Sequence, residues 1–166
     1  MAAKGMKKIP IFVTAGATKN PVRAPRYKIA LVKERGSMYV TSKPINHPEM
    51  ILKQLQDLFE DTDREAFYII CLDQKMKVIG VNLVSTGTLT ASLVHPREVF
   101  KVAILLNAAW LIAVHNHPSG TPQPSNEDHR LTKRLQDAGE LMGIKLRDHI
   151  IVADDLYYSF NEHGYL

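Results

Sequence analysis

Cysteine is almost missing from the sequence, which holds one, Cys71, in 166 residues. An intramolecular disulfide therefore cannot form, which is typical of proteins that work in a reducing cytoplasm, and we expect a cytoplasmic protein. Because Cys71 lies inside the apolar run FYIICL, it is expected to be a buried strand thiol rather than a nucleophile or metal ligand. The lone cysteine also excludes a zinc deaminase, which needs a Pro-Cys-x-x-Cys motif together with His-x-Glu.

Long hydrophobic runs are missing as well. No stretch approaches the roughly 20 apolar residues that a membrane-spanning helix needs. Lys4, Lys7 and Lys8 precede IPIFV as in an export signal, but this run is interrupted by Pro10 and is shorter than the apolar core of about seven to fifteen residues in such signals. We therefore expect neither a membrane protein nor an exported one.

The charged residues are divided unevenly along the chain. Residues 1–44 carry ten Lys and Arg and one acid, net +9, whereas residues 45–166 carry eleven Lys and Arg and sixteen acids, net −5, which sum to the formal charge of +4. A basic segment of this kind either contacts nucleic acid or an acidic protein, or is simply a solvated tail. DNA contact through residues 1–44 and a solvated arm both remain open.

Three segments are expected along the chain. Residues 1–26 have no sustained hydrophobic period, and we interpret them as a basic N-terminal arm. Residues 27–61 predict a hairpin, in which YKIALV and MYVT flank the turn ERGS, followed by a helix, because PEMILKQLQDLFED has apolar residues close to helical spacing. Residues 62–166 form the main domain.

Strands and helices alternate within the main domain, which predicts an α/β (α+β) fold. The expected helices are HPREVFKVAILLNAA and a second one that begins at Ser125 and ends before Gly143. The expected strands are FYIICLD, VIGVNLVS, LTASLV, LIAVHNH, DHIIV and YYSF.

Metal-binding residues gather in HNHPSGTPQPSNED, residues 115–128, directly after the apolar strand LIAV. Alternate residues near a strand end point to the same side, so His115 and His117 can offer their imidazoles to one ion. Asn116 would point away from it. Asp128, in the first turn of the following helix, can reach back with a carboxylate oxygen. Two nitrogens, one carboxylate and a fourth position for water make the arrangement of a catalytic zinc site.

A simpler explanation accounts for part of this segment. Ser125-x-x-Asp128 fits a capping box, in which Asp128 only binds the start of its helix, and a lone histidine near a strand end is usually a hydrogen-bonding residue. Neither explains the His-x-His pair or the prolines that preset a turn between it and the acid. We therefore favour a metal site of His115, His117 and Asp128.

The same residues resemble a known family. His115-Asn116-His117-Pro118, then six residues to Ser125 and two more to Asp128, is similar to the signature of the JAB/MPN metalloprotease-like family. HNHPSG, PSNED, HPREVF and RDHIIV together resemble its bacterial RadC branch, over about residues 62–166. The resemblance implies a mixed central β-sheet flanked by helices, layered as in cytidine deaminases, that holds one zinc ion.

The resemblance also implies catalytic roles. The family has an upstream acid that acts as general base on the zinc-bound water, and Glu65 fits by position just before FYIICLD. Glu98 is the rival base, although an acid in the first turn of a helix is also explained by the helix dipole. Ser125 would hydrogen-bond the oxyanion of the substrate. Asn116 departs from the Ser or Thr of the peptidase branch, which puts the substrate in doubt more than the metal.

Three functions compete. The first is zinc-dependent hydrolysis of amide or isopeptide bonds, by a metallopeptidase whose peptide or protein substrate the sequence does not identify. The second is a nucleic-acid-associated DNA repair protein of the RadC type, or a metal-dependent nuclease, although residues 1–60 contain no clear helix-hairpin-helix motif. The third is a non-catalytic binding module, against which the three retained ligands argue. A homo-oligomer is compatible with all three.

Overall fold

The computed structural model describes residues 27–28, 31–32, 43–45, 47–59, 64–87 and 94–166, and for residues 54–58 the backbone alone. The chain divides into two units, Met1–Lys33 and Glu34–Leu166. All helices and strands of the described residues belong to the second unit. They are α1 (Pro48–Phe59), β1 (Ala66–Leu72), β2 (Val78–Thr86), α2 (Pro96–Leu105), β3 (Trp110–Asn116), α3 (Asn126–Met142), β4 (Lys145–Ala153) and β5 (Leu156–Ser159).

The five strands form one mixed sheet in the order β2-β1-β3-β4-β5. β3 and β4 are parallel, with α3 as the connection between them, and the other neighbours are antiparallel. The pairing of β3 with β4 contains a bulge. Leu111 pairs with Leu146 but Ile112 pairs with Asp148, so Arg147 is an extra residue in β4.

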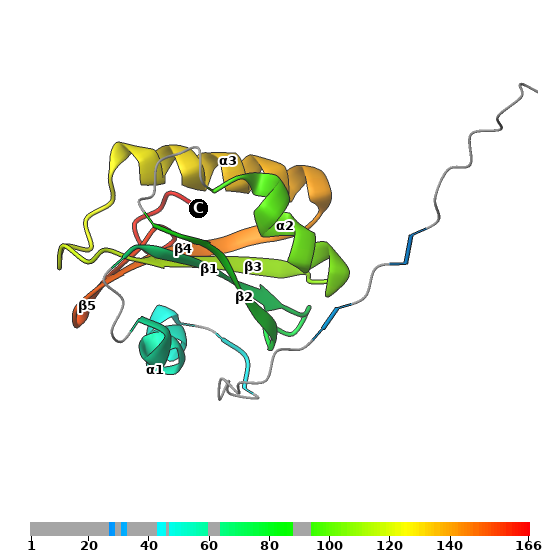
Figure 1. Cartoon of the computed structure of the whole chain (residues 1–166), viewed down its shortest axis with the longest axis horizontal. Coiled ribbons are helices and arrows are strands. Elements are labelled where there is room, and N and C mark those ends of the chain that lie inside the picture. Colours follow the sequence, from blue (N-terminus) through cyan, green and yellow to red (C-terminus); the bar gives the residue numbers. More distant parts are fainter. Residues whose placement is uncertain (1–26, 29–30, 33–42, 46, 60–63, 88–93) are drawn as a thin grey trace, which may run out of the picture. The chain divides into compact units, whose positions relative to one another are not determined.

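Helices cover both faces of the sheet (Figure 1). α2 and α3 lie on one face, over a core that includes Phe67, Phe100 and Leu135. α1 lies on the other face, where Ile51 packs in a second core with Val114 of β3 and other apolar strand residues. Since both faces are covered, the central strands β1 and β3 are apolar almost throughout, as their burial shows.

The helix ends follow the residues that the sequence places there. Pro96 opens α2, and the side chain of His95 accepts a hydrogen bond from the N–H of Arg97. α3 begins with a capping box between Ser125 and Asp128 and ends at Gly143, whose φ of 69° lies in the left-handed region that favours glycine. The capping box thus coexists with the candidate metal site at Asp128.

The fold agrees with the prediction of a mixed sheet flanked by helices. The predicted helices at PEMILKQLQDLF and PREVFKVAIL and the helix after Ser125 are present, as are five of the strands. Most of the hairpin expected in residues 27–61, and most of the strand LTASLV, lie outside the described residues; the described residues 27–28 and 31–32 form no strand. Cys71 is buried in β1 as expected, and burial raises the pKa of its thiol to about 12. Among the described residues, no helix has the length and apolar character needed to cross a membrane.

Candidate metal centre

Two histidines lie where β3 ends. His115 is the penultimate residue of the strand and is completely buried, with its ring stacked on Phe67 of the neighbouring strand. His117 follows the strand, and its backbone N–H donates to the carbonyl of Val152 on β4 at 2.8 Å. The pairing of both flanking strands with β3 therefore holds this end of the chain in place. The two rings meet with their Nε2 atoms 3.1 Å apart.

The third member of the group comes from α3, whose first turn lies at the same end of the sheet (Figure 1). Asp128 is buried, with Oδ1 3.3 Å from Nε2 of His115 and Oδ2 3.7 Å from Nε2 of His117. In a tetrahedral zinc site with bonds of about 2.0–2.1 Å, neighbouring ligand atoms are about 3.3 Å apart. His115, His117 and Asp128 therefore form a group that could hold a metal ion.

The hydrogen bond made by the other nitrogen of His117 supports this fit. Its Nδ1 lies 2.8 Å from the carbonyl oxygen of Thr121. Because a carbonyl only accepts, Nδ1 carries the hydrogen, and in the neutral ring Nε2 presents a lone pair toward Asp128. Lone pairs that face a carboxylate at these distances repel one another unless a cation or proton lies between them. The donor set thus matches what a metal ion requires.

The charges in the site are set by burial and by its own hydrogen bonds. Burial lowers the pKa of His115, and the carboxylates of Asp128 and Glu65 oppose that shift only in part. Burial alone would raise the pKa of Asp128, but the hydrogen bond and positive charge of a protonated His115, together with the two donors of Ser125, outweigh it and hold this pKa well below its usual range. Neutral imidazole and ionised carboxylate are the forms in which these groups bind a metal.

Ser125 lies beside the group rather than in it. Its hydroxyl donates to Oδ2 of Asp128 at 2.6 Å, its backbone N–H donates to the same oxygen at 2.7 Å, and the hydroxyl accepts from the N–H of Asp128 at 3.2 Å. These bonds orient the carboxylate and leave its Oδ1 facing His115. Ser125 itself is an exposed residue.

Glu65 precedes β1, and the opposite strand fixes its backbone. The side chain of Asn116 accepts a hydrogen bond from the N–H of Ala66 at 2.7 Å and donates one to the carbonyl of Arg64 at 3.1 Å. The carbonyl of Glu65 accepts from the N–H of Gly87 at 2.8 Å. The Glu65 carboxylate is near enough to His115 to act on the pKa of that ring, which burial lowers more strongly. Asn116, predicted to point away from the ion, thus holds both neighbours of Glu65.

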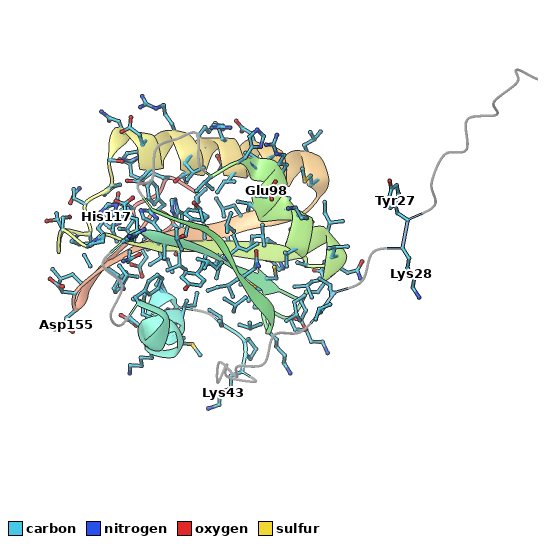
Figure 2. All side chains as sticks on the ribbon, viewed as in Figure 1. Tyr27, Lys28, Lys43, Glu98, His117 and Asp155 are labelled. Carbon is cyan, nitrogen blue, oxygen red and sulfur yellow. The ribbon has the colours of Figure 1, made fainter. Side chains whose placement is uncertain are left out.

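Glu98 lies elsewhere. Figure 2 shows it on α2, well apart from His117 at the end of the sheet. Its carboxylate pairs with Arg97 and Lys101 on the same helix, and the hydrogen bond from Lys101 lowers its pKa. The structure therefore explains Glu98 as a helix-surface residue.

Two polar residues behind the group complete its surroundings. His149 on β4 is completely buried, and Nε2 of its ring lies 2.9 Å from Nδ1 of His115. Thr132, buried one turn beyond Asp128 on α3, contacts the other nitrogen of His149. In the sequence, His149 stands out only as part of the motif RDHIIV, and Thr132 does not stand out at all. The signal that could have identified Thr132 is its place on the helix, since it is a polar residue four positions after Asp128, among the buried positions of α3.

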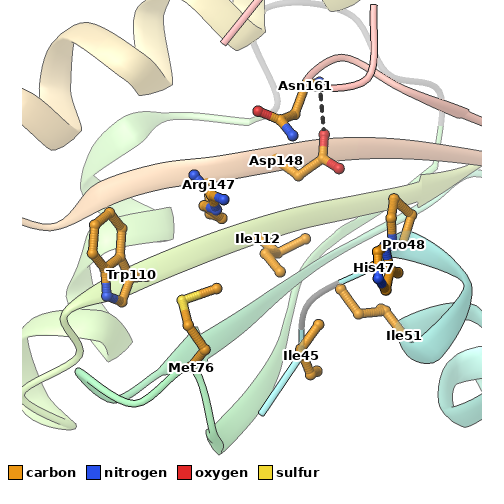
Figure 3. A pocket seen from close by; sticks show the side chains of 10 residues that line it. All are labelled: Ile45, His47, Pro48, Ile51, Met76, Trp110, Ile112, Arg147, Asp148 and Asn161. Carbon is orange, nitrogen blue, oxygen red and sulfur yellow. Dashed lines mark hydrogen bonds between the residues drawn. The ribbon is translucent and has the colours of Figure 1, made fainter.

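A cavity of about 450 Å³ lies away from these residues. Figure 3 shows its lining residues, among them Trp110 and Ile112 of β3, Arg147 and Asp148 of β4, and Ile51 of α1. Asp148 is turned toward Asn161, and its Oδ1 accepts a hydrogen bond from the backbone N–H of Asn161 at 3.0 Å. None of the three possible ligands lines this cavity, so the candidate metal centre is a separate site at the end of β3.

The sequence matches a known protein family over most of its length. The model of the RadC-like JAB domain family matches residues 45–165. A UPF0758 protein of Thermotoga maritima is 53% identical over 104 residues, 63% of this chain and 47% of that protein. One of Desulfitobacterium hafniense is 43% identical over 149 residues, 87% of this chain and 65% of that protein. The chain thus spans about half to two thirds of the length of these curated relatives.

Proposed function

Because the chain belongs to the RadC-like JAB domain family, we propose that it is a zinc-dependent hydrolase of amide or isopeptide bonds, and thus a metallopeptidase. The convergence of two imidazole nitrogens and one carboxylate within 4.8 Å of one another carries this proposal. The set leaves room for a fourth ligand, as in catalytic rather than structural zinc sites. A bound zinc ion supplies Lewis acidity and makes a water molecule acidic enough to attack near neutral pH.

Glu65 is the general base of this proposal. It takes a proton from the attacking water and returns it to the leaving amine, which a carboxylate beside the metal ligands can do. The position supports this role, since its charge acts on His115 and Asn116 holds the backbone on both sides of it. Glu98 does not suit the role, because it pairs with Lys101 on α2.

Ser125 is the oxyanion donor of this proposal. Its hydroxyl hydrogen is shared with Asp128 at 2.6 Å, and that hydrogen turns to the substrate oxygen when negative charge develops there. The backbone N–H of Ser125 continues to hold Asp128 at 2.7 Å. Ser125 can therefore donate to a substrate without releasing the carboxylate.

Zinc content is the first test. Protein purified without a metal-affinity tag should contain near-stoichiometric zinc by mass spectrometry, and Asp128→Ala should lose it. The matched control is Asp137→Ala, which removes an exposed carboxylate on the same helix that pairs with Lys133. A wild type that contains no zinc and refuses added zinc would refute the hydrolase and favour a non-catalytic binding module.

Hydrolysis is the second test. The zinc-loaded protein should cleave members of a peptide library, and Glu65→Gln should abolish cleavage while keeping its zinc. Glu140→Gln, an exposed change of the same chemistry near Lys145, should leave cleavage intact. Loss of zinc in Glu65→Gln would instead make Glu65 a ligand or a structural residue.

The nucleic-acid function remains a prediction from charge. It depends on residues 1–44, most of which lie outside the described residues. Salt-dependent DNA binding that disappears on removal of residues 1–26 would support it, since phosphate contacts release counterions. Binding that is unchanged by this removal would exclude the arm as its cause.

A further inference from the structure

We propose that Thr132 and His149 form a buried relay that sets the tautomer of His115, so that its Nε2 presents a lone pair to the metal. They are positioning residues, because they contact the backbone carbonyl of Asp128 and Nδ1 of His115 rather than the atoms that would bind the metal. The inference rests on the proposed zinc site and deepens it. It assigns a shared role to two residues that the hydrolytic mechanism does not use.

The relay begins at Thr132. Its Oγ1 lies 2.6 Å from the backbone carbonyl of Asp128 and 2.7 Å from Nδ1 of His149. A hydroxyl has one hydrogen, and a carbonyl can only accept. Thr132 therefore donates to Asp128, and its oxygen must accept from His149, which places a hydrogen on Nδ1 of that ring.

The tautomer of His149 in turn determines the tautomer of His115. The ring is completely buried, and neither of its two hydrogen-bond partners carries a negative charge, so it is neutral. A neutral imidazole with its hydrogen on Nδ1 has a lone pair on Nε2. That lone pair faces Nδ1 of His115 at 2.9 Å and accepts its hydrogen. The neutral His115 is left with a bare Nε2, the atom that faces Asp128 and His117.

Aromatic neighbours fix the orientation of the two imidazole rings in the relay. The ring of Phe160 stacks on His149 with centroids 5.0 Å apart and an interplanar angle of 11°. Phe67 meets His149 edge-on at 5.6 Å and stacks on His115 at 5.9 Å. Because these rings enclose both imidazoles, neither can rotate to exchange its nitrogens without disturbing the core.

The two histidines of the site reach the same state by different routes. His117 is fixed by the carbonyl of Thr121, a local contact within its own loop. His115 is fixed through Thr132 and His149, which come from α3 and β4. Partners of this kind typically contribute a factor of about 10–100 to metal affinity. Losing the relay should therefore weaken zinc binding without removing a ligand.

Thr132→Val and Thr132→Ser make a matched pair for the test. Valine keeps the shape of threonine but leaves the His149 N–H without an acceptor. That ring then favours the tautomer with its hydrogen on Nε2, donates to His115, and drives the hydrogen of His115 onto its own Nε2. Serine keeps the hydroxyl and loses only a methyl group. We expect zinc affinity to fall about 10- to 100-fold in Thr132→Val and to stay close to wild type in Thr132→Ser.

Two measurements on the full chain decide the outcome. Zinc dissociation constants come from competition with a chromophoric chelator, together with melting curves of the metal-free proteins. Long-range ¹H–¹⁵N spectra of metal-free wild type should show the hydrogen of His115 on Nδ1, and Thr132→Val should move it to Nε2. Equal zinc affinity in all three proteins would overturn the relay, as would a hydrogen on Nε2 of His115 in the wild type. A wild type that binds no zinc would instead overturn the proposed function, and the spectra alone would then decide the relay.

Discussion

Replacing Asn116 by alanine tests how the fold holds Glu65 in position. The side chain makes two hydrogen bonds, at 2.7 Å to the N–H of Ala66 and at 3.1 Å to the carbonyl of Arg64. Ala66 is only 3% exposed, so its N–H would lose its partner in a place that water does not reach. Arg64 is exposed, and its carbonyl can turn to solvent.

The expected cost follows from this difference. An orphaned buried N–H costs about 1–3 kcal/mol, and the loss of an ordinary hydrogen bond about 0.5–1.5 kcal/mol. The free energy of unfolding should therefore fall by about 2–4 kcal/mol. In a domain of this size each kcal/mol shifts the melting temperature by roughly 2–4 °C, so we expect a drop of roughly 5–15 °C. Zinc content should be unchanged, because no ligand is altered, whereas hydrolysis should fall as Glu65 loses its support.

Differential scanning calorimetry and metal analysis of the same samples provide the assay. Asn126→Ala serves as the control, since Asn126 is exposed at the start of α3 and such changes usually stay within about 0.5 kcal/mol. Asn116→Asp separates the two bonds, because a carboxylate can accept from Ala66 but faces the Arg64 carbonyl without a donor. A melting temperature for Asn116→Ala within about 2 °C of wild type would refute the reasoning.

Other predictions concern packing, reactivity and pH. Gly139→Ala would place a Cβ 2.6 Å from the carbonyl oxygen of Ile144, so the free energy of unfolding measured in urea should fall by about 1–3 kcal/mol. An unchanged midpoint of urea unfolding would contradict such close packing. Cys71, buried and with a pKa near 12, should react with a thiol reagent at pH 8 only after unfolding, and rapid labelling of the native protein would disprove its burial. Burial lowers the pKa of both His115 and His149, so the unfolded state binds more protons; the stability of the metal-free protein should fall as pH drops below about 6.5. Equal urea midpoints at pH 7.5 and 5 would exclude this.

The group of three possible ligands could be foreseen because its geometry is local. His115 and His117 are two residues apart at a strand end, so the alternation of a strand brings them to one side. Asp128 follows after a short loop, and its capping box with Ser125 identifies where α3 begins. Local rules of this kind are legible in a sequence without knowledge of the rest of the fold.

The surroundings of that group could not be foreseen in the same way. The Asn116 bonds join residues 50 and 52 positions apart, and whether they form depends on which strands become neighbours. Thr132 and His149 come from a helix and a strand that meet only once β4 has joined β3. Their hydrogen-bond partners are a property of the assembled sheet, which hydrophobic periodicity does not encode.

The bulge at Arg147 decides which side chain of β4 lies behind the candidate metal centre. With the bulge, His149 pairs with Ala113 and faces the same side of the sheet as His115, while Asp148 pairs with Ile112 and faces the other side. If β4 paired without the bulge, Arg147 would stand opposite Ile112 and Asp148 opposite Ala113, because a shift by one position reverses every later side chain of a strand. A carboxylate would then stand behind His115 in place of an imidazole. The irregular pairing at Arg147 thus selects His149 as the partner of His115.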